Sequence, residues 1–280
     1  MTRNAELAGA TAVFLGGGRI TSAILAGLKV AGSRDRVVVH DHNQSKLKLL
    51  RRLYAVTVEP QLEQAIAQAG LLVIAVRPDA VPFLLRDMKA ILTLQSKRQT
   101  VPPRLAVSLA AGIQLVGLRQ MLGPHALWAR AMPSPVCRTG NGLTALVFER
   151  GFPPRRRSQV RDFLRKIGSL LELPERKFDA FTVTYSSSHG YYALEALADA
   201  GRQFGLDRKT ALTAASHALA DGINSWRRQN IPLDRLLEAA STPGGIAEAT
   251  MAAMDRNGYR EAVQRGLRAG LARARAIARP

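Results

Sequence analysis

A short loop of small residues interrupts the helical second half of the chain. Ser241, Thr242, Pro243, Gly244 and Gly245 stand between two long segments rich in alanine and leucine. Two glycines after a proline are unfavourable inside a helix, so we expect a loop here. At the start of the next helix, its backbone N–H groups would face an anion such as a carboxylate. Ser241, Thr242, Gly244 and Gly245 are therefore candidate substrate-binding residues.

A second glycine-rich turn, near the N-terminus, has the spacing of a dinucleotide-binding motif. Gly16-x-Gly18-x-x-Thr21 follows the apolar run 11–15 and opens a helical pattern. The first glycine allows a tight turn, the second lets the backbone approach a pyrophosphate, and the helix N-terminus offers N–H groups. Thr21 stands where a third glycine or an alanine is usual. The candidate cofactor-binding residues of this turn are Gly16, Gly18, Arg19 and Ile20.

Asp41 lies about twenty residues past this turn, after the apolar run 36–40. An acidic side chain there accepts hydrogen bonds from both adenosine ribose hydroxyls, which favours NADH because a carboxylate repels the 2′-phosphate of NADPH. His42 and Lys46 follow at once and would bind that phosphate if Asp41 turned away. Asp41 and His42 are candidate cofactor residues, and NADPH and NADH both stay open.

Apolar and helical patterns alternate through the first half of the chain. The apolar runs are 11–15, 36–40, 71–76, 105–109 and 127–132. Such alternation predicts an α/β fold with a Rossmann-type doubly wound parallel sheet. Past residue 155 we expect only helices, over 155–171, 178–204, 208–229, 232–240, 247–254 and 259–278. The prediction is a tail over 1–10, a dinucleotide-binding domain over 11–153 and an all-helical substrate and dimerisation domain over 154–280. A boundary near Pro174 is the alternative.

Composition limits the class of protein. The chain has 280 residues, 47% of them hydrophobic, which fits a globular protein. No apolar run is long enough to span a membrane and residues 1–10 lack the apolar segment of a signal peptide, so we expect a cytoplasmic protein without a membrane partner. The single cysteine, Cys137, excludes a disulfide framework. Cys137 is expected to be a packed thiol, and no metal-ligand spacing occurs.

The net charge of +19 is typical of nucleic-acid-binding proteins. The arginines are scattered over every segment, however, and no nucleic-acid-binding motif accompanies them. We therefore expect a solvated basic surface and no nucleic-acid partner. A nucleic-acid-associated protein stays open as an alternative and would show salt-sensitive retention on DNA.

With these residues in place, the chain resembles the Δ1-pyrroline-5-carboxylate reductase family, which reduces a cyclic imine acid to proline. The resemblance covers nearly the whole length after residue 10. It rests on six motifs in family order, at 14–18, 75–78, 107–113, 130–133, 195–201 and 242–245.

The resemblance implies a cytoplasmic enzyme of proline biosynthesis that uses NADPH or NADH. Its helical domain would intertwine with a second subunit, giving at least a homodimer, and the partner would build part of the active site. The resemblance also implies cofactor contacts from Val76, Arg77, Pro78, Ala110 and Met132.

Three departures from the family pattern fall where the resemblance places the substrate or the nicotinamide. Ile246 and Ala247 replace two threonines that normally follow the Pro-Gly-Gly loop. The stretch 186–192 is shortened and rewritten, and 134–136 reads Ser-Pro-Val in place of Asn-Thr-Pro. A conserved scaffold with an altered pocket favours a relative that acts on a different imine.

The rewritten stretch contains the candidate catalytic residues. Hydride transfer to a C=N carbon needs a proton for the nitrogen, and an imidazole suits that role at neutral pH. His189 is the candidate proton donor, with Tyr191 as the second candidate and Tyr185 and Tyr192 able to share the role. Packing is the alternative role for all four. Ser187 and Ser188 are candidates to bind a carboxylate, or else helix caps.

The best prediction from the sequence is therefore NAD(P)H-dependent reduction of a small cyclic imine acid, with pyrroline-5-carboxylate as substrate and proline as product. A related reductase acting on a different imine is the close alternative. A non-catalytic dinucleotide-binding regulatory protein is the other, and it would bind NAD(P)H without turning over any imine.

Overall fold

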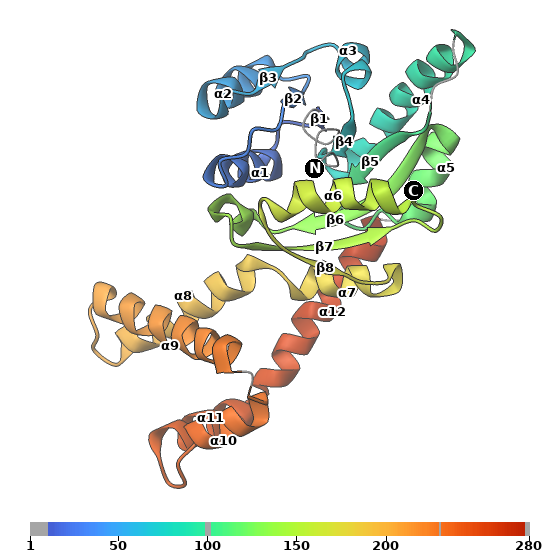
Figure 1. Cartoon of the computed structure of the whole chain (residues 1–280). Helices are drawn as coiled ribbons and strands as arrows, with labels where there is room; N and C mark the ends of the chain where they lie inside the picture. The colour runs from blue at the N-terminus through green and yellow to red at the C-terminus, as the bar shows by residue number, and fades with distance from the viewer. Residues whose placement is uncertain (1–10, 99–101, 230, 278–280) are drawn as a thin grey trace, which may run out of the picture. The chain divides into compact units, whose positions relative to one another are not determined.

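The computed structural model describes residues 11–98, 102–229 and 231–277, and the chain divides into two compact units (Figure 1). The first unit runs up to Tyr185 and includes the segment from Leu271 onward, while the second comprises residues 186–270. The expected boundary at residue 153 therefore differs from the observed division, because the segment 154–185 packs with the sheet.

The first unit is built on a single eight-stranded sheet (Figure 1). Its strands are β1 (Ala12–Leu15), β2 (Val37–His40), β3 (Thr57–Val58), β4 (Leu71–Ile74), β5 (Arg104–Ser108), β6 (Ala126–Pro133), β7 (Gly142–Phe148) and β8 (Gly168–Glu172). Their spatial order is β3-β2-β1-β4-β5-β6-β7-β8. All neighbours pair in parallel except β6 and β7. The direction of winding changes between β1 and β4, as the expected doubly wound fold requires.

Helices cover both faces of this sheet. On one face lie α1 (Arg19–Val30), α2 (Gln44–Tyr54) and α6 (Pro154–Arg165), and on the other lie α3 (Leu62–Ala67), α4 (Val81–Arg98) and α5 (Leu115–Leu122). Phe14 packs with the first group and Leu15 with the second. Strands buried on both faces read as continuous apolar runs, which is why β1, β2 and β4 could be recognised in the sequence.

The region 155–185 differs from the all-helical prediction. Helix α6 ends at Arg165, and residues 168–172 form β8 beside β7. Gly168 has φ +138°, and a Cβ there would collide with the carbonyl oxygen of Gly142, so the two backbones meet only because residue 168 has no side chain. Pairing with β7 stabilises β8, and a local pattern in so short a segment does not reveal that pairing.

A buried arginine fastens helix α7 (Glu175–Thr184) to this sheet. Arg130 on β6 is 1% exposed, and its guanidinium lies 4.3 Å from the ring centroid of Phe178. It donates to Glu175 at 2.6 Å and to Asp179 at 3.2 Å. An arginine buried so completely needs carboxylate partners, and both lie on α7.

The segment from Leu271 also packs in the first unit. Gly112, in the loop after β5, has φ +79°, and a Cβ there would lie 2.5 Å from the carbonyl oxygen of Ala274. Ala274 itself is buried. Close approach of these two backbones therefore requires glycine at position 112.

The second unit is helical. It comprises α8 (Ser187–Gln203), α9 (Arg208–Gln229), α10 (Leu233–Ala240), α11 (Ile246–Arg256) and most of α12 (Tyr259–Ile277). The single helix expected over 178–204 is broken at Tyr185 and Ser186, where Ser186 caps α8 by accepting the N–H of Ser188 at 3.4 Å. Residue 278, the expected end of the last helix, lies outside the described residues.

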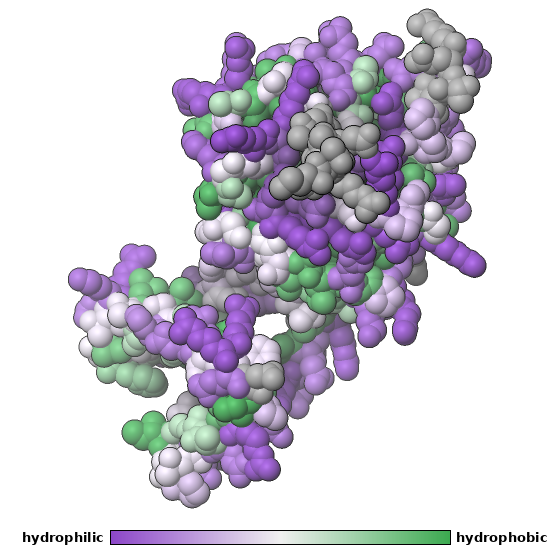
Figure 2. Space-filling model, viewed as in Figure 1, coloured by the Kyte–Doolittle hydropathy of each residue, from purple (hydrophilic) through white to green (hydrophobic). Residues whose placement is uncertain are grey.

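Little apolar surface of the second unit is covered by the unit itself. Among its described residues only Ala198, Ala211 and Ala215 are fully buried, where α8 packs on α9. Figure 2 shows apolar surface over these helices. Large apolar side chains that stay exposed include Phe204, Leu212, Ile223, Trp226, Leu233, Leu237, Ile246 and Met254. Exposure on this scale indicates a surface for association.

Candidate dinucleotide and substrate sites

The turn between β1 and α1 is held by its first glycine and by Thr21. Gly16 has φ +113°, and a Cβ there would lie 2.8 Å from the carbonyl carbon and oxygen of Ala75, so only glycine fits. Thr21 is fully buried, and its hydroxyl donates to the carbonyl oxygen of Gly16 at 2.6 Å. Thr21 therefore closes the turn from within, which accounts for its place at a position where glycine or alanine is usual.

Gly18 is needed for a different reason. It is the N-cap of α1, where no side chain accepts a hydrogen bond from the first helical turn. A Cβ at Gly18 would meet no atom within 4 Å. The space beside it is thus open, and the N–H groups and positive dipole end of α1 are available to a pyrophosphate.

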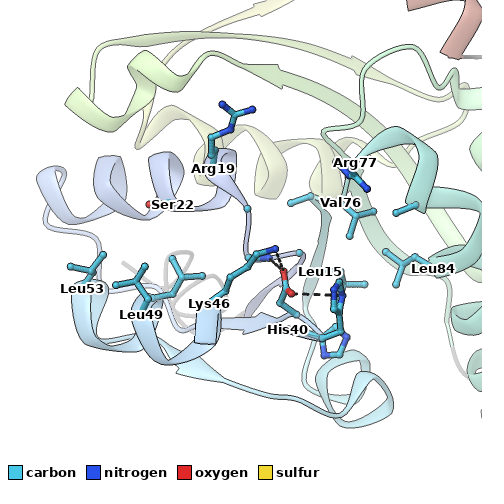
Figure 3. Close-up of a pocket in the computed structure, with 18 residues that line it drawn as sticks. Leu15, Arg19, Ser22, His40, Lys46, Leu49, Leu53, Val76, Arg77 and Leu84 are labelled. Carbon is cyan, nitrogen blue, oxygen red and sulfur yellow. Dashed lines mark hydrogen bonds and ion pairs between the residues drawn. The ribbon is translucent and has the colours of Figure 1, made fainter. Parts of the chain in front are cut away.

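A pocket of about 680 Å³ opens at this turn (Figure 3). In Figure 3, Leu49 and Leu53 of α2 lie on one side, and Val76, Arg77 and Leu84 lie on the opposite side. The predicted cofactor residues that line the pocket are Gly16, Gly18, Arg19, Asp41, His42, Val76 and Arg77. The volume of the pocket and the backbone N–H groups of the turn 16–18 fit part of a dinucleotide.

Four predicted cofactor residues do not line this pocket: Ile20, Pro78, Ala110 and Met132. Ile20 packs against the core, and Pro78 begins a short 3₁₀ helix. Ala110 follows the end of β5, and Met132 lies near the end of β6. The carboxyl ends of parallel strands form the edge where ligands bind in such sheets, so Ala110 and Met132 stay proposed contacts beyond the pocket.

Asp41 is turned inward, away from the position expected for a ribose ligand. Its side chain is 6% exposed, and its Oδ2 and Oδ1 atoms accept the N–H groups of Gly17 and Asn43, both at 2.8 Å. Lys46 Nζ lies 3.6 Å from Oδ2. Burial opposes the charged form, but the two amides and Lys46 together hold the pKa of Asp41 below its usual value. The carboxylate is thus already engaged, which argues against Asp41 as the acceptor for both ribose hydroxyls.

The side chains beside Asp41 are accessible basic groups, and His42 Nδ1 and Lys46 Nζ lie 3.7 and 3.6 Å from its carboxylate oxygens. His42 has a 95% exposed side chain and Lys46 a 47% exposed one, and both line the pocket. An inward carboxylate flanked by outward basic groups is the arrangement that would accept the 2′-phosphate of NADPH. The sequence left NADH and NADPH both open, and this geometry favours NADPH.

Sequence reasoning missed several pocket residues. Leu49 and Leu53 are 44% and 45% exposed, so α2 presents apolar side chains to the pocket as well as to the core. Ser22 also lines the pocket, and its hydroxyl is 2.8 Å from that of Tyr54. Apolar residues on the outer side of an amphipathic helix were the available signal.

In the second unit, α8 carries the candidate proton donors. His189 and Tyr191 line a surface hollow together with Ser188, Tyr192 and Glu195. Tyr191 and Tyr192 are 65% and 75% exposed. None of residues 241–245 lines this hollow, and neither does Ser187. His189, Tyr191 and Ser188 therefore lie together in this hollow, and the loop 241–245 does not contribute to it.

Two of the other candidates have structural partners. The hydroxyl of Tyr185 accepts the backbone N–H of Leu143 on β7 at 2.8 Å. The hydroxyl of Ser188 is 2.7 Å from that of Ser186, the N-cap of α8. Tyr185 therefore helps to hold the chain to the sheet, and Ser188 takes part in the cap.

The loop 241–245 has the expected backbone, and one of its N–H groups binds an anion from the chain itself. Gly244 has φ +73°, and Gly245 is the N-cap of α11 and donates to the carbonyl oxygen of Thr242 at 2.8 Å. The N–H of Gly244 donates to the Glu248 carboxylate at 2.6 Å. Sequence reasoning missed Glu248, whose side chain reaches back four residues to the loop.

Other expectations concern the thiol, metals and membranes. Cys137 is fully buried, and burial raises its pKa to about 11, so it is a packed thiol. In the part of the chain that the structure describes, no group of three or more histidine, cysteine and acidic residues is arranged to hold a metal. Within the same ranges, no helix has the length and apolarity to cross a bilayer.

Two family models match the chain. The model described as "Pyrroline-5-carboxylate reductase dimerisation" matches residues 175–277, and "NADP oxidoreductase coenzyme F420-dependent" matches residues 11–101. A pyrroline-5-carboxylate reductase from Mycobacterium tuberculosis is 29% identical over 279 residues, covering 92% of this chain and 94% of that protein. One from Synechocystis is 27% identical over 267 residues, covering 94% and 96%. The chain is thus similar to pyrroline-5-carboxylate reductases over nearly its whole length.

Solved structures share the fold over nearly the whole chain. Plasmodium falciparum pyrroline carboxylate reductase with NADP bound has a TM-score of 0.84 at 20% identity, covering 97% of this chain and 99% of that one. The Streptococcus pyogenes 1-pyrroline-5-carboxylate reductase has the same TM-score at 22% identity, covering 96% and 99%. A reductive aminase from Aspergillus terreus in complex with NADPH is more distant, with a TM-score of 0.57 at 13% identity, covering 96% and 92%.

The resemblance to this family and the fold class predicted from the sequence are thereby confirmed. So is the class of enzyme, an oxidoreductase that uses a nicotinamide cofactor. The matched dimerisation region supports a homo-oligomer.

Proposed function

We propose that this protein reduces pyrroline-5-carboxylate to proline with NADPH. The observation that carries the proposal is the open dinucleotide turn at Gly18, in a chain whose segment 175–277 matches the reductase dimerisation region. The relatives that it matches over nearly their whole length are pyrroline-5-carboxylate reductases. A related imine is the alternative substrate, because Ile246 and Ala247 stand where the family has threonines.

The groups in the pocket fit the parts of NADPH. The first-turn N–H groups of α1 would bind the pyrophosphate, and His42 and Lys46 would bind the 2′-phosphate. Leu49 and Leu53 would contact the adenine. Bound NADPH supplies the hydride.

The substrate's charges would be held by the second unit. The backbone N–H groups at the start of α11 would bind the carboxylate, with Ser241 and Thr242 beside them. His189 would donate the proton that the imine nitrogen needs, with Tyr191 as the second donor. These roles are proposals for the residues named.

The helical unit would complete the active site in a homodimer. Its exposed apolar side chains, Trp226 and Leu237 among them, need cover that the described part of the unit does not provide. We place this enzyme in the cytoplasm and assign it neither a nucleic-acid nor a membrane partner. Light scattering tests the assembly: a monomer at micromolar concentration would contradict it.

An NADPH oxidation assay with a panel of cyclic imines tests the activity. We expect turnover of pyrroline-5-carboxylate, with kcat/KM lowered by about 10²-fold in His189→Ala if the imidazole is the proton donor. His217→Ala is the matched control, because His217 is an exposed histidine on α9 that pairs with Asp221. If His189→Ala matches the wild type, His189 has a packing role. Binding of NADPH without turnover of any imine would instead favour the regulatory alternative.

A further inference from the structure

The carboxylate of Glu248 binds a backbone N–H group that a substrate carboxylate would also bind. Its Oε2 atom accepts the N–H of Gly244 at 2.6 Å, and Gly244 belongs to the loop proposed to bind the acid group of the imine. Glu248 is exposed and lies in the first turn of α11. A charge-assisted hydrogen bond of this length is stronger than one between neutral groups.

Two carboxylates cannot share this donor. A single N–H donates one strong bond, and like charges at such separation repel each other. The N–H of Gly245 offers no substitute, because it donates to Thr242 within the loop. Backbone N–H groups at the start of α11 would still bind a substrate carboxylate, but that carboxylate would lie in the same helical turn as the charge of Glu248. The side chains of Ile246 and Ala247 add no donor for an acid group.

We propose that Glu248 is a specificity-determining residue, whose carboxylate competes with that of the substrate at the Gly244 amide. This inference rests on the proposed function, since it concerns the acid group of the same imine. Competition of this kind lowers the preference for imines that carry a carboxylate relative to neutral imines of the same ring. An enzyme with Glu248 beside this loop would therefore also accept imines that lack a carboxylate.

Matched substrates and variants test the proposal. Pyrroline-5-carboxylate and 1-pyrroline share a ring and differ in the carboxylate, so the ratio of their kcat/KM values isolates recognition of the acid group. Glu248→Gln keeps an oxygen that can accept the Gly244 N–H only in a weaker bond between neutral groups, and it removes the charge that repels a substrate carboxylate. We expect it to raise this ratio about tenfold. Glu248→Ala removes both and should raise the ratio as well. Glu238→Gln, which removes an exposed carboxylate on neighbouring α10, should not change it.

Calorimetric titration with L-proline separates this inference from the proposed activity. Proline should bind about tenfold more tightly to Glu248→Gln than to the wild type. An unchanged kcat/KM ratio and unchanged proline affinity in both Glu248 variants would overturn the inference. Absence of proline binding by all forms would overturn it too. Tighter proline binding without NADPH oxidation would support the role of Glu248 and refute the activity.

Discussion

The carboxylate of Asp41 accepts the backbone N–H of Gly17 at 2.8 Å, so the end of β2 is tied directly to the turn after β1. This bond fixes the middle residue of the Gly16–Gly18 segment and leaves the helix N-terminus free for a ligand. It also turns the negative charge away from the pocket mouth, where His42 and Lys46 remain accessible. One hydrogen bond therefore shapes the turn and changes the electrostatics of the site.

The two outer glycines of the turn should respond differently to substitution. Gly18→Val should abolish NADPH binding with little loss of stability, because its side chain enters open space needed by the pyrophosphate. Gly16→Ala should lower the melting temperature, because its φ of +113° and the nearby Ala75 carbonyl exclude a side chain. Fluorescence titration and thermal unfolding measure the two effects. Full cofactor affinity in Gly18→Val would mean that the turn is only structural.

Lys46 should set the preference for NADPH. Lys46→Ala removes a cation from the pocket mouth, so KM for NADPH should rise about tenfold while KM for NADH changes little. His42→Ala should act in the same direction. The control is Lys48→Ala, an exposed lysine on the same helix that does not line the pocket. Equal effects on both cofactors would contradict a 2′-phosphate contact.

Asp41 should make stability depend on acid pH. Its pKa in the folded protein lies below the value of about 3.9 that aspartate has in an unfolded chain. Such a group contributes stability that is present above pH 4 or so and is lost as pH falls through the folded pKa. Asp41→Asn should lower the free energy of unfolding at pH 7 by about 1–3 kcal/mol and flatten the acid limb. Urea unfolding at a series of pH values measures this, and an unchanged acid limb would show that other carboxyl groups dominate it.

Arg130 should be costly to remove. Arg130→Met leaves Glu175 and Asp179 without their buried cation, so the free energy of unfolding should fall by about 3–5 kcal/mol. Arg235→Met, which breaks an exposed pair with Glu238, should change it by at most about 0.5 kcal/mol. Denaturation is compared at one protein concentration, because an oligomer's stability depends on it. Equal effects of both substitutions would argue against the buried pair.

An element could be predicted from the sequence when it depends on residues that are adjacent in the chain. The turn at Gly16–Thr21 and the buried strand β1 depend on adjacent residues, so their spacing was sufficient. Strand β8 depends on pairing with β7 and on a close backbone approach at Gly168, neither of which leaves a local pattern.

In the candidate site, too, local features could be predicted from the sequence and features that depend on distant residues could not. The sequence indicated that Asp41 would lie at the pocket, but its direction depends on the Gly17 amide, which only the folded turn places beside it. Leu49 was expected only as part of a helix, because its neighbours across the pocket come from the loop after β4 and from α4. The contact of Glu248 with Gly244 spans only four residues, but the spacing alone does not show which donor the side chain reaches.

The packing of Ala274 over Gly112 has a consequence for the order in which the protein is made. On the ribosome, the sheet emerges long before the segment that covers the loop after β5, and the entire helical unit is synthesised between them. In the nascent chain, the loop after β5 therefore stays uncovered until α12 has been translated. Expression of the Rossmann region by itself would keep it in this unfinished state, prone to the aggregation that incomplete domains show.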